Sequence, residues 1–167
     1  MTTSALPPLQ AEDFRIRMAI ETDVEALVVL INAAFVVEQI AIEGDRVNVD
    51  KIYDYMNRGK FLLLEDAESL LGCVYGELRG DRGYVGLLSV HPALQRKGLG
   101  RRLMAAVEQY LRESGCVMVA LRIISARPEL LAFYTKLGFA ETGISPMPAE
   151  TLLKRPCHFI HLSKPLR

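Results

Sequence analysis

Residues 84–124 constrain the fold most strongly, because they follow the pattern strand, loop, helix, strand. Residues 84–90 predict a strand that stops before Pro92, and residues 98–114 predict a long helix. Residues 116–124 are nearly all apolar, which is typical of a strand buried on both faces. Two strands joined by a crossover helix run parallel in one sheet, with a right-handed connection. The chain is therefore expected to contain at least one parallel strand pair.

The segments on either side of this unit predict further strands and helices. Thr22 or Asp23 is a candidate N-cap for the helix that follows the first strand. Turn residues at 66–69 and 80–83 separate the strands of an antiparallel meander in the centre of the chain. The remaining strands are expected at residues 14–18, 61–65, 70–78, 139–144 and 158–162, and the remaining helices at 26–34, 49–57 and 128–137.

The length of 167 residues is about that of one ordinary domain. Half of the residues are hydrophobic, which is enough for a core that needs no disulfide or metal. Twenty basic and 20 acidic side chains balance, so the net charge favours neither a nucleic acid nor a membrane partner. No secretory signal and no apolar run of about 18 residues is visible. We therefore expect a cytoplasmic protein with a flexible leader at residues 1–13 and one domain at residues 14–167.

The cysteines and histidines do not predict a metal site. The cysteines are odd in number and include no C-x-x-C pair, so they are expected to be reduced, buried and structural: Cys73, Cys116 and Cys157. His158 and His161 lie three apart on an expected strand, so their side chains point to opposite faces. His91 precedes a proline at a strand end, which is typical of a turn residue more than of a catalytic base.

The most informative segment for function is the loop and helix start at residues 90–101. The first turn of a helix leaves backbone N–H groups without partners, and the helix dipole places partial positive charge there. Gly98 and Gly100 carry no side chain, so a phosphate can approach this backbone closely. The segment matches neither G-x-x-x-x-G-K-[ST] nor G-x-G-x-x-G, since position 103 is leucine. Two glycines alone are also compatible with a tight turn beside surface arginines.

Two blocks of the sequence resemble the GCN5-related N-acetyltransferases. Residues 95–100, Gln-Arg-Lys-Gly-Leu-Gly, match the Q/R-x-x-G-x-G/A motif of that family and follow its central strand. Residues 133–139, Phe-Tyr-Thr-Lys-Leu-Gly-Phe, are similar to its later helix-to-strand signature. The blocks occur in the right order, and the resemblance covers roughly residues 14–163. It implies an α/β (α+β) fold with a mixed, mostly antiparallel sheet, a splayed parallel strand pair and helices on both faces.

The resemblance also implies acetyl-coenzyme A (acetyl-CoA) as co-substrate and a division of labour along the chain. Main-chain groups of the central strand would pair with the pantetheine arm, because splayed strands leave unpaired backbone groups. Amides of the glycine loop would bind the pyrophosphate. The residues implied for binding are Leu88, Ser89, Val90, Gln95, Arg96, Lys97, Gly98, Leu99, Gly100 and Arg101.

Tyr134 falls on the family's position for the acid that protonates the leaving thiolate. A phenol has a pKa of about 10, so it is protonated at neutral pH and can donate a proton to sulfur. The alternative is a core aromatic whose hydroxyl is satisfied elsewhere. The developing negative charge on the thioester oxygen would be met by a main-chain N–H near Val90.

The base that deprotonates the amine is weakly indicated. Glu77, late in an expected strand, is one candidate, although acidic residues on strands are more often solvated. Gly86 occupies a central-strand position where related enzymes often carry an acid. Arg127 stands seven residues before Tyr134, at a position where the family often has asparagine. A contact between Arg127 and coenzyme A is therefore not predicted.

Acceptor specificity is expected to come from residues 35–49 and 142–154. The first segment is acidic, because it contains Glu38, Glu43 and Asp45 and is followed by Asp50. These carboxylates would attract a cationic amine. The alternative is that they are ordinary exposed surface charges. The leading hypothesis is direct transfer of acetyl to a primary amine of a small molecule. The alternatives are a protein or peptide amine, or a non-catalytic acyl-CoA-binding module. A homodimer formed through exposed sheet edges is a further possibility.

Overall fold

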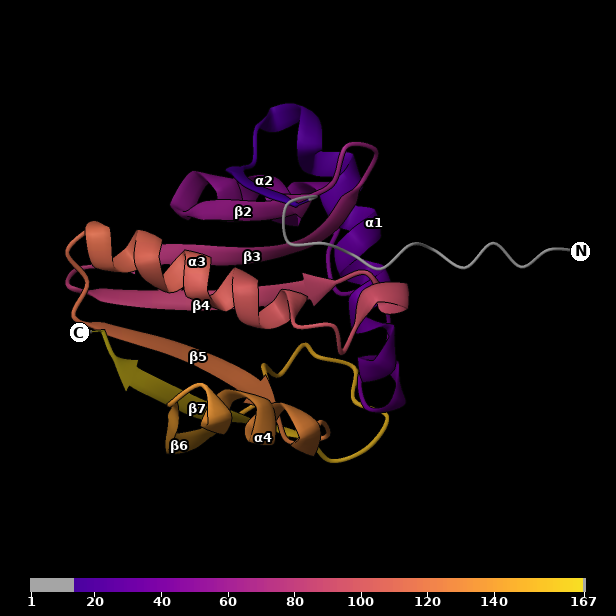
Figure 1. The fold of residues 1–167 in the computed structure, drawn as a ribbon. Coiled ribbons are helices and arrows are strands. Elements are labelled where there is room, and N and C mark those ends of the chain that lie inside the picture. The colour runs from indigo at the N-terminus through magenta and orange to yellow at the C-terminus, as the bar shows by residue number, and fades with distance from the viewer. Residues whose placement is uncertain (1–13, 167) are drawn as a thin grey trace, which may run out of the picture.

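The computed structural model describes residues 14–166. The leader expected at residues 1–13 lies outside the described residues. The remaining elements follow in the order that the sequence predicts (Figure 1). The strands are β1 (Arg15–Met18), β2 (Lys60–Glu65), β3 (Leu70–Arg79), β4 (Arg82–Val90), β5 (Met118–Ile124), β6 (Ala140–Pro146) and β7 (His158–Pro165). The α-helices are α1 (Val24–Phe35), α2 (Val49–Arg58), α3 (Leu99–Glu113) and α4 (Pro128–Lys136), and short 3-10 turns form η2 (Glu21–Asp23), η3 (Val36–Ile40) and η4 (Pro92–Leu94).

The strands of the described chain form one sheet in the order β1-β2-β3-β4-β5-β7-β6. Every neighbouring pair is antiparallel except β4 and β5, which run parallel. α3 is the crossover helix that joins this parallel pair, as residues 84–124 predict. The expectation of a mixed, mostly antiparallel sheet is therefore confirmed.

Helices cover both faces of the sheet, and each face has its own core (Figure 1). On one face, Leu27 and Ile31 of α1 and Ile52 of α2 are fully buried against strand side chains. On the other face, α3 buries Leu103 and Leu111. A sheet with two buried faces is rigid across its width. Any opening within it is therefore held in a defined shape.

Such an opening lies between β4 and β5. The two strands pair over only three positions, from Arg82 opposite Met118 to Tyr84 opposite Ala120. Beyond these positions the strands diverge, so residues 85–90 of β4 have no partner in β5 (Figure 1). The β5-facing edge of β4 therefore presents main-chain groups that an extended amide ligand can pair with.

The prediction that β5 is buried on both faces is wrong. Leu121 and Ile123 belong to the core beneath α3, whereas Arg122 between them is exposed. The Arg122 side of the strand lines a cavity instead of packing under a helix. The apolar run at residues 116–124 does not indicate that one side of the strand faces a cavity, because a single arginine can face the cavity while the strand conformation is kept.

β4 contains an irregularity that the sequence did not indicate. The pairing register with β3 shifts between Cys73, opposite Ser89, and Tyr75, opposite Gly86, so β4 holds one extra residue there. Leu87 within this bulge has a φ of 54°, which is uncommon for a residue other than glycine. A bulge bends its strand and redirects the neighbouring backbone groups. This bulge lies where β4 has already separated from β5.

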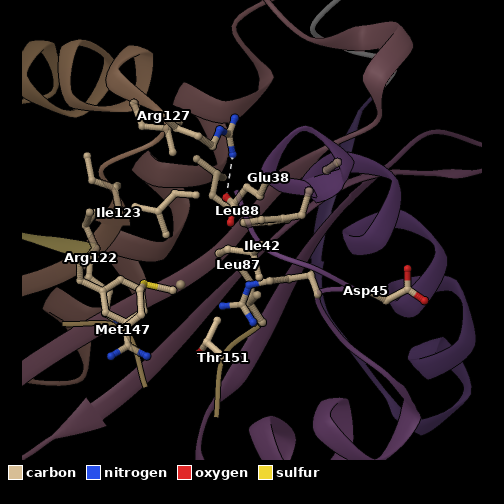
Figure 2. A pocket seen from close by; sticks show the side chains of 18 of the residues that line it. Glu38, Ile42, Asp45, Leu87, Leu88, Arg122, Ile123, Arg127, Met147 and Thr151 are labelled. Carbon is tan, nitrogen blue, oxygen red and sulfur yellow. Dashed lines mark hydrogen bonds and ion pairs between the residues drawn. The ribbon is translucent and has the colours of Figure 1, made fainter. Parts of the chain in front are cut away.

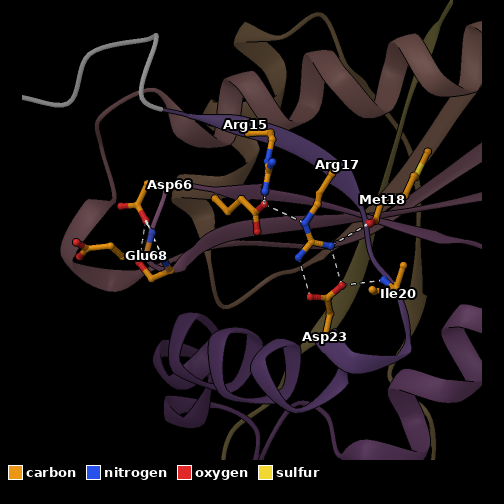
Figure 3. A network of polar contacts seen from close by, with 9 residues as sticks. Arg15, Arg17, Met18, Ile20, Asp23, Asp66 and Glu68 are labelled. Atoms are coloured by element: carbon orange, nitrogen blue, oxygen red, sulfur yellow. Dashed lines mark hydrogen bonds and ion pairs between the residues drawn. The ribbon is translucent and has the colours of Figure 1, made fainter.

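A polar network ties β1 to β2 and to the turn before α1 (Figure 3). Thr22 or Asp23 was expected to cap α1; Asp23 is the N-cap residue, but its carboxylate does not bond to an α1 amide. It accepts two hydrogen bonds of 2.8 Å from the Arg17 guanidinium and one of 2.8 Å from the Ile20 amide. The hydrogen bonds from Arg17 lower the pKa of Asp23, so its contribution to stability is lost as the pH falls.

Candidate active site

The glycine loop leaves a row of backbone amides at the start of α3. Gly98 is the N-cap residue and has a φ of 81°, in the left-handed region that favours glycine. No side chain caps this end of α3. Within residues 14–166, the first amide of the helix to find a carbonyl partner is that of Arg102, which bonds to the Gly98 oxygen at 3.2 Å. The amides before it are free to bind an anion.

Side chains around this helix start divide by exposure. Leu99 is buried in the core, so it can offer only its backbone to a ligand. Gln95 reaches back to the Val90 carbonyl, to which its Nε2 donates at 3.3 Å. The charged residues of the segment are exposed: Arg96, Lys97 and Arg101. Positive side chains and unpartnered amides fit a diphosphate at this position.

His91 is confirmed as a turn residue. Its Nδ1 accepts a hydrogen bond of 3.1 Å from the Ala93 amide, at the start of η4. This bond fixes the turn that leads from β4 into the glycine loop.

A cavity of about 510 Å³ opens at the place where β4 and β5 separate (Figure 2). Among the predicted site residues, it is lined by Leu88, Val90, Gln95 and Tyr134. The others do not line it: Ser89 is buried and its hydroxyl donates to the Leu87 carbonyl at 2.9 Å, and residues 96–101 form the adjoining helix start. The two segments expected to set acceptor specificity also line the cavity, with residues 42–46, 147–148 and 150–152.

Tyr134 is held rigidly at this cavity. It is 6% exposed and packs edge-on against Phe133 and Phe139, with ring centroids 5.0 and 5.6 Å away. Tyr134 belongs to the core on the α3 face, as the core-aromatic alternative expects, but its hydroxyl has no hydrogen-bond partner among residues 14–166. Burial raises the pKa of Tyr134, against the nearby positive charge of Arg127. The phenol therefore stays protonated over the whole physiological range.

Glu38 and Arg127 form a buried ion pair at the same cavity, and the sequence did not link them. Arg127 Nη1 donates to Glu38 Oε2 at 3.1 Å, and the two side chains are 16% and 10% exposed (Figure 2). Burial raises the pKa of Glu38, and the hydrogen bond from Arg127 opposes that shift. Arg127 also pairs with Glu129 at 2.9 Å. The pair joins η3 to the residue before α4, across 89 positions of sequence.

The structure places Glu77 away from the cavity lining. Its carboxylate accepts hydrogen bonds from Tyr75 at 2.8 Å, from Arg79, and from Arg58 at 3.4 Å. Burial opposes ionisation of Glu77, but the hydrogen bonds from Tyr75 and Arg79 outweigh it and lower its pKa. A carboxylate engaged in this way is a poor base. Gly86 does line the cavity, beside the Tyr84 ring, so no acid replaces it there.

The remaining structural findings concern metals, thiols and membranes. Among residues 14–166, no three His, Cys, Asp or Glu side chains gather closely enough to hold a metal ion. Cys73 and Cys116 are free and buried as expected, whereas Cys157 is only partly buried. No helix in this part of the chain is both long and apolar enough to cross a bilayer.

Substitution of Gly100 is predicted to separate cofactor binding from folding. A Cβ at Gly100 would meet Phe133, Leu88 and Val90 at 3.6–3.9 Å, which is ordinary contact. Gly100→Ala should therefore fold normally while crowding the ligand, and its apparent KM for acetyl-CoA should rise about 10-fold with kcat little changed. Steady-state kinetics at saturating acceptor measure this effect. Gly143→Ala, on β6 outside the cavity lining and with open space around it, is the matched control; an unaltered KM in Gly100→Ala would contradict the role of the loop.

Comparison with known proteins shows the family of this chain. The sequence profile of the acetyltransferase (GNAT) family matches residues 26–139. Mycothiol acetyltransferase of Saccharopolyspora erythraea is 32% identical over 105 residues, which are 62% of this chain and 35% of that protein. A protein of Oryza sativa subsp. japonica named "Probable glucosamine 6-phosphate N-acetyltransferase 2" is 35% identical over 78 residues, 44% of this chain and 45% of that protein. The chain thus spans less than half the length of these curated relatives.

Solved structures share the fold over nearly the whole chain. An acetyltransferase structure from Salmonella typhimurium, solved with its cofactor acetyl-CoA, superposes with a TM-score of 0.73 at 25% identity and covers 93% of this chain and 95% of its own. The ribosomal-protein-S18-alanine N-acetyltransferase of Escherichia coli has a TM-score of 0.73 at 20% identity, with 92% and 94% covered. Because the family profile spans well over half of the sequence, the chain belongs to the GNAT family of acetyltransferases.

Proposed function

We propose that the chain transfers an acetyl group from acetyl-CoA to a primary amine of a small molecule by direct attack. The observation that carries this proposal is the position of Tyr134, with an unpartnered hydroxyl in the cavity that β4 and β5 open. Acetyl-CoA supplies the activated acyl group. The amides that precede Arg102 bind its diphosphate, and the free edge of β4 at Leu88, Ser89 and Val90 pairs with its extended arm.

Within this site each residue has a separate task. Tyr134 donates its proton to the departing thiolate sulfur, which needs only modest help because a thiol has a pKa of about 8.5. A main-chain N–H near Val90 meets the negative charge that develops on the thioester oxygen. The exposed acids at the cavity mouth, Glu43 and Asp45, attract a cationic amine.

A small-molecule acceptor is favoured over a protein because the two acceptor segments are joined above the cavity. Ile42 and Leu153 form an isolated antiparallel bridge. The Glu43 amide donates to the Leu152 carbonyl at 2.9 Å, and the Lys154 amide to the Ala41 carbonyl at 2.7 Å. A peptide would need an open groove along this wall. The names of the two curated relatives, which refer to mycothiol and glucosamine 6-phosphate, agree with a small acceptor.

Thiol release from acetyl-CoA across a panel of small amines, amino acids and peptides tests the proposal. We expect release with a subset of the small amines and none with peptides. Acetyl-CoA at about 100 times its Kd should also raise Tm by about 5 °C or more, because it binds only the folded state. Stabilisation without release for any amine would favour a non-catalytic acyl-CoA-binding module. Absence of both effects would overturn the assignment.

The predicted homodimer remains open to measurement. β6 is an edge strand with mostly exposed side chains, so its outer edge can pair with a second copy. Sedimentation equilibrium gives the mass directly.

A further inference from the structure

Two arginines from separate parts of the chain line the cavity without a carboxylate partner among residues 14–166. Arg46 follows η3 in the first acceptor segment, and Arg122 lies on β5. Each guanidinium lies over an aromatic ring that also lines the cavity: Arg46 over Phe35 at 5.5 Å, and Arg122 over Phe159 at 4.1 Å. Arg58, Arg79 and Arg102 also lie over aromatic rings. Arg46 and Arg122 differ from these three because both line the cavity.

Stacking on a ring prepares a guanidinium for an anion. The ring occupies one face of the planar group, and the N–H donors at its rim remain available. Because the ring restricts the side chain, less rotamer entropy is lost when a ligand binds. A carboxylate or a phosphate group matches this arrangement, since either accepts two parallel N–H bonds from one guanidinium.

No carboxylate of the cavity lining forms an ion pair with Arg46 or Arg122, although the positive charge of Arg46 acts on nearby Glu38. Arg127 and Glu38 satisfy one another at 3.1 Å. In Figure 2 that pair lies at one end of the cavity, while Arg122 lies beside Met147 at another end. The Asp45 carboxylate points away from both groups in this view. An anion at Arg46 and Arg122 would therefore meet two available cations without displacing an existing ion pair.

We infer that Arg46 and Arg122 bind an anionic group of the acceptor, so that the preferred acceptors are amines that also carry a carboxylate or a phosphate. This inference rests on the proposed function, because it names the substrate class of the same cavity. The acceptor is then a zwitterion. Its ammonium group is attracted by the exposed acids at the cavity mouth, and its anionic group is held by the two arginines.

Two matched pairs of amines test the inference. Leucine and leucinamide differ in a carboxylate, and phosphoethanolamine and ethanolamine differ in a phosphate. With the full chain and saturating acetyl-CoA, kcat/KM should be about 10- to 100-fold higher for the anionic member of at least one pair, as charge-assisted hydrogen bonds produce. The pair with the larger ratio identifies which of the two anions is bound. Equal or higher kcat/KM for both neutral members would overturn the inference and leave the proposed function standing.

Two variants assign the effect to the arginines. Arg46→Gln and Arg122→Gln should each raise KM for the preferred anionic amine about 10-fold or more, with kcat and the kinetics of the neutral member nearly unchanged. Arg82→Gln, at an exposed position outside the cavity lining, is the control and should match the wild type. Equal losses for both members of a pair would show a structural role and overturn the inference.

A binding measurement keeps the inference testable if no amine of the panel is acetylated. Calorimetric titration of leucine and of phosphoethanolamine into the protein with coenzyme A present does not depend on turnover. Binding to the wild type that is lost in Arg46→Gln would support the anion site, even though the proposed reaction had failed. If neither leucine nor phosphoethanolamine gives a heat of binding to the wild type, the inferred anion site is contradicted.

Discussion

Tyr134→Phe is expected to lower kcat about 100-fold while the Kd for acetyl-CoA stays nearly unchanged. General acid catalysis contributes about 10²- to 10⁴-fold, and the low end applies here because a thiolate leaves without much help. Phenylalanine retains the ring that packs against Phe133 and Phe139, so only the proton donor is removed. Single-turnover kinetics and a direct cofactor titration measure the two quantities.

The pH dependence of kcat provides a second test of Tyr134. A general acid must be protonated, and burial raises the pKa of this phenol above its ordinary value of about 10. The wild-type kcat should therefore show no loss from ionisation of Tyr134 between pH 6 and about pH 9. Tyr53→Phe, at an exposed position on α2 outside the cavity, serves as the control variant. Full activity in Tyr134→Phe would remove Tyr134 from the mechanism.

Arg127→Met is expected to lower the free energy of unfolding by about 3 kcal/mol at pH 7.5, because it leaves Glu38 as an unpaired buried charge. This loss corresponds to a fall in Tm of about 6–12 °C for a chain of this size. The double variant Glu38→Gln with Arg127→Met should recover much of that stability, since no buried charge remains. Urea unfolding followed by circular dichroism measures all three proteins.

The loss in Arg127→Met should also depend on pH, with a sign that the Glu38 environment sets. Burial raises the pKa of Glu38 in the folded protein, so the folded state binds its proton more tightly than the unfolded state does. Stability therefore falls as the pH rises through the range above the unfolded pKa of about 4.3. Removal of Arg127 raises the folded pKa further, so the loss should be small at pH 5 and largest near pH 8.

The control for this pair is Arg112→Met, which removes an exposed arginine from α3 and should change stability by less than about 0.5 kcal/mol. An equal loss in Arg127→Met at pH 5 and pH 8 would contradict the account of Glu38 as a buried charge that Arg127 compensates.

Local sequence patterns were sufficient to predict each α-helix and strand of residues 14–166, because each pattern depends on near neighbours, but they did not predict the short 3-10 turns. The 98–114 prediction, for example, matches α3 at Leu99–Glu113, since Gly98 and Gly115 bound an amphipathic stretch. The glycine loop and its unpartnered amides at the start of α3 were predictable for the same reason, because these amides and glycines are contiguous in one segment. The prediction that the Asp23 side chain caps α1 was wrong, because Arg17 binds its carboxylate instead.

Residues 90–101 and Tyr134 could thus be recognised in the sequence by itself, together with the parallel strand pair. The tertiary structure alone brought Glu38 to Arg127, placed Arg46 and Arg122 at one cavity, joined Ile42 to Leu153 and excluded Glu77. The physical reason is that contacts between residues far apart in the sequence depend on how whole helices and strands pack. The sequence around a single charged residue does not indicate which residue it will contact. The divergence of β4 from β5 decides where those partners meet.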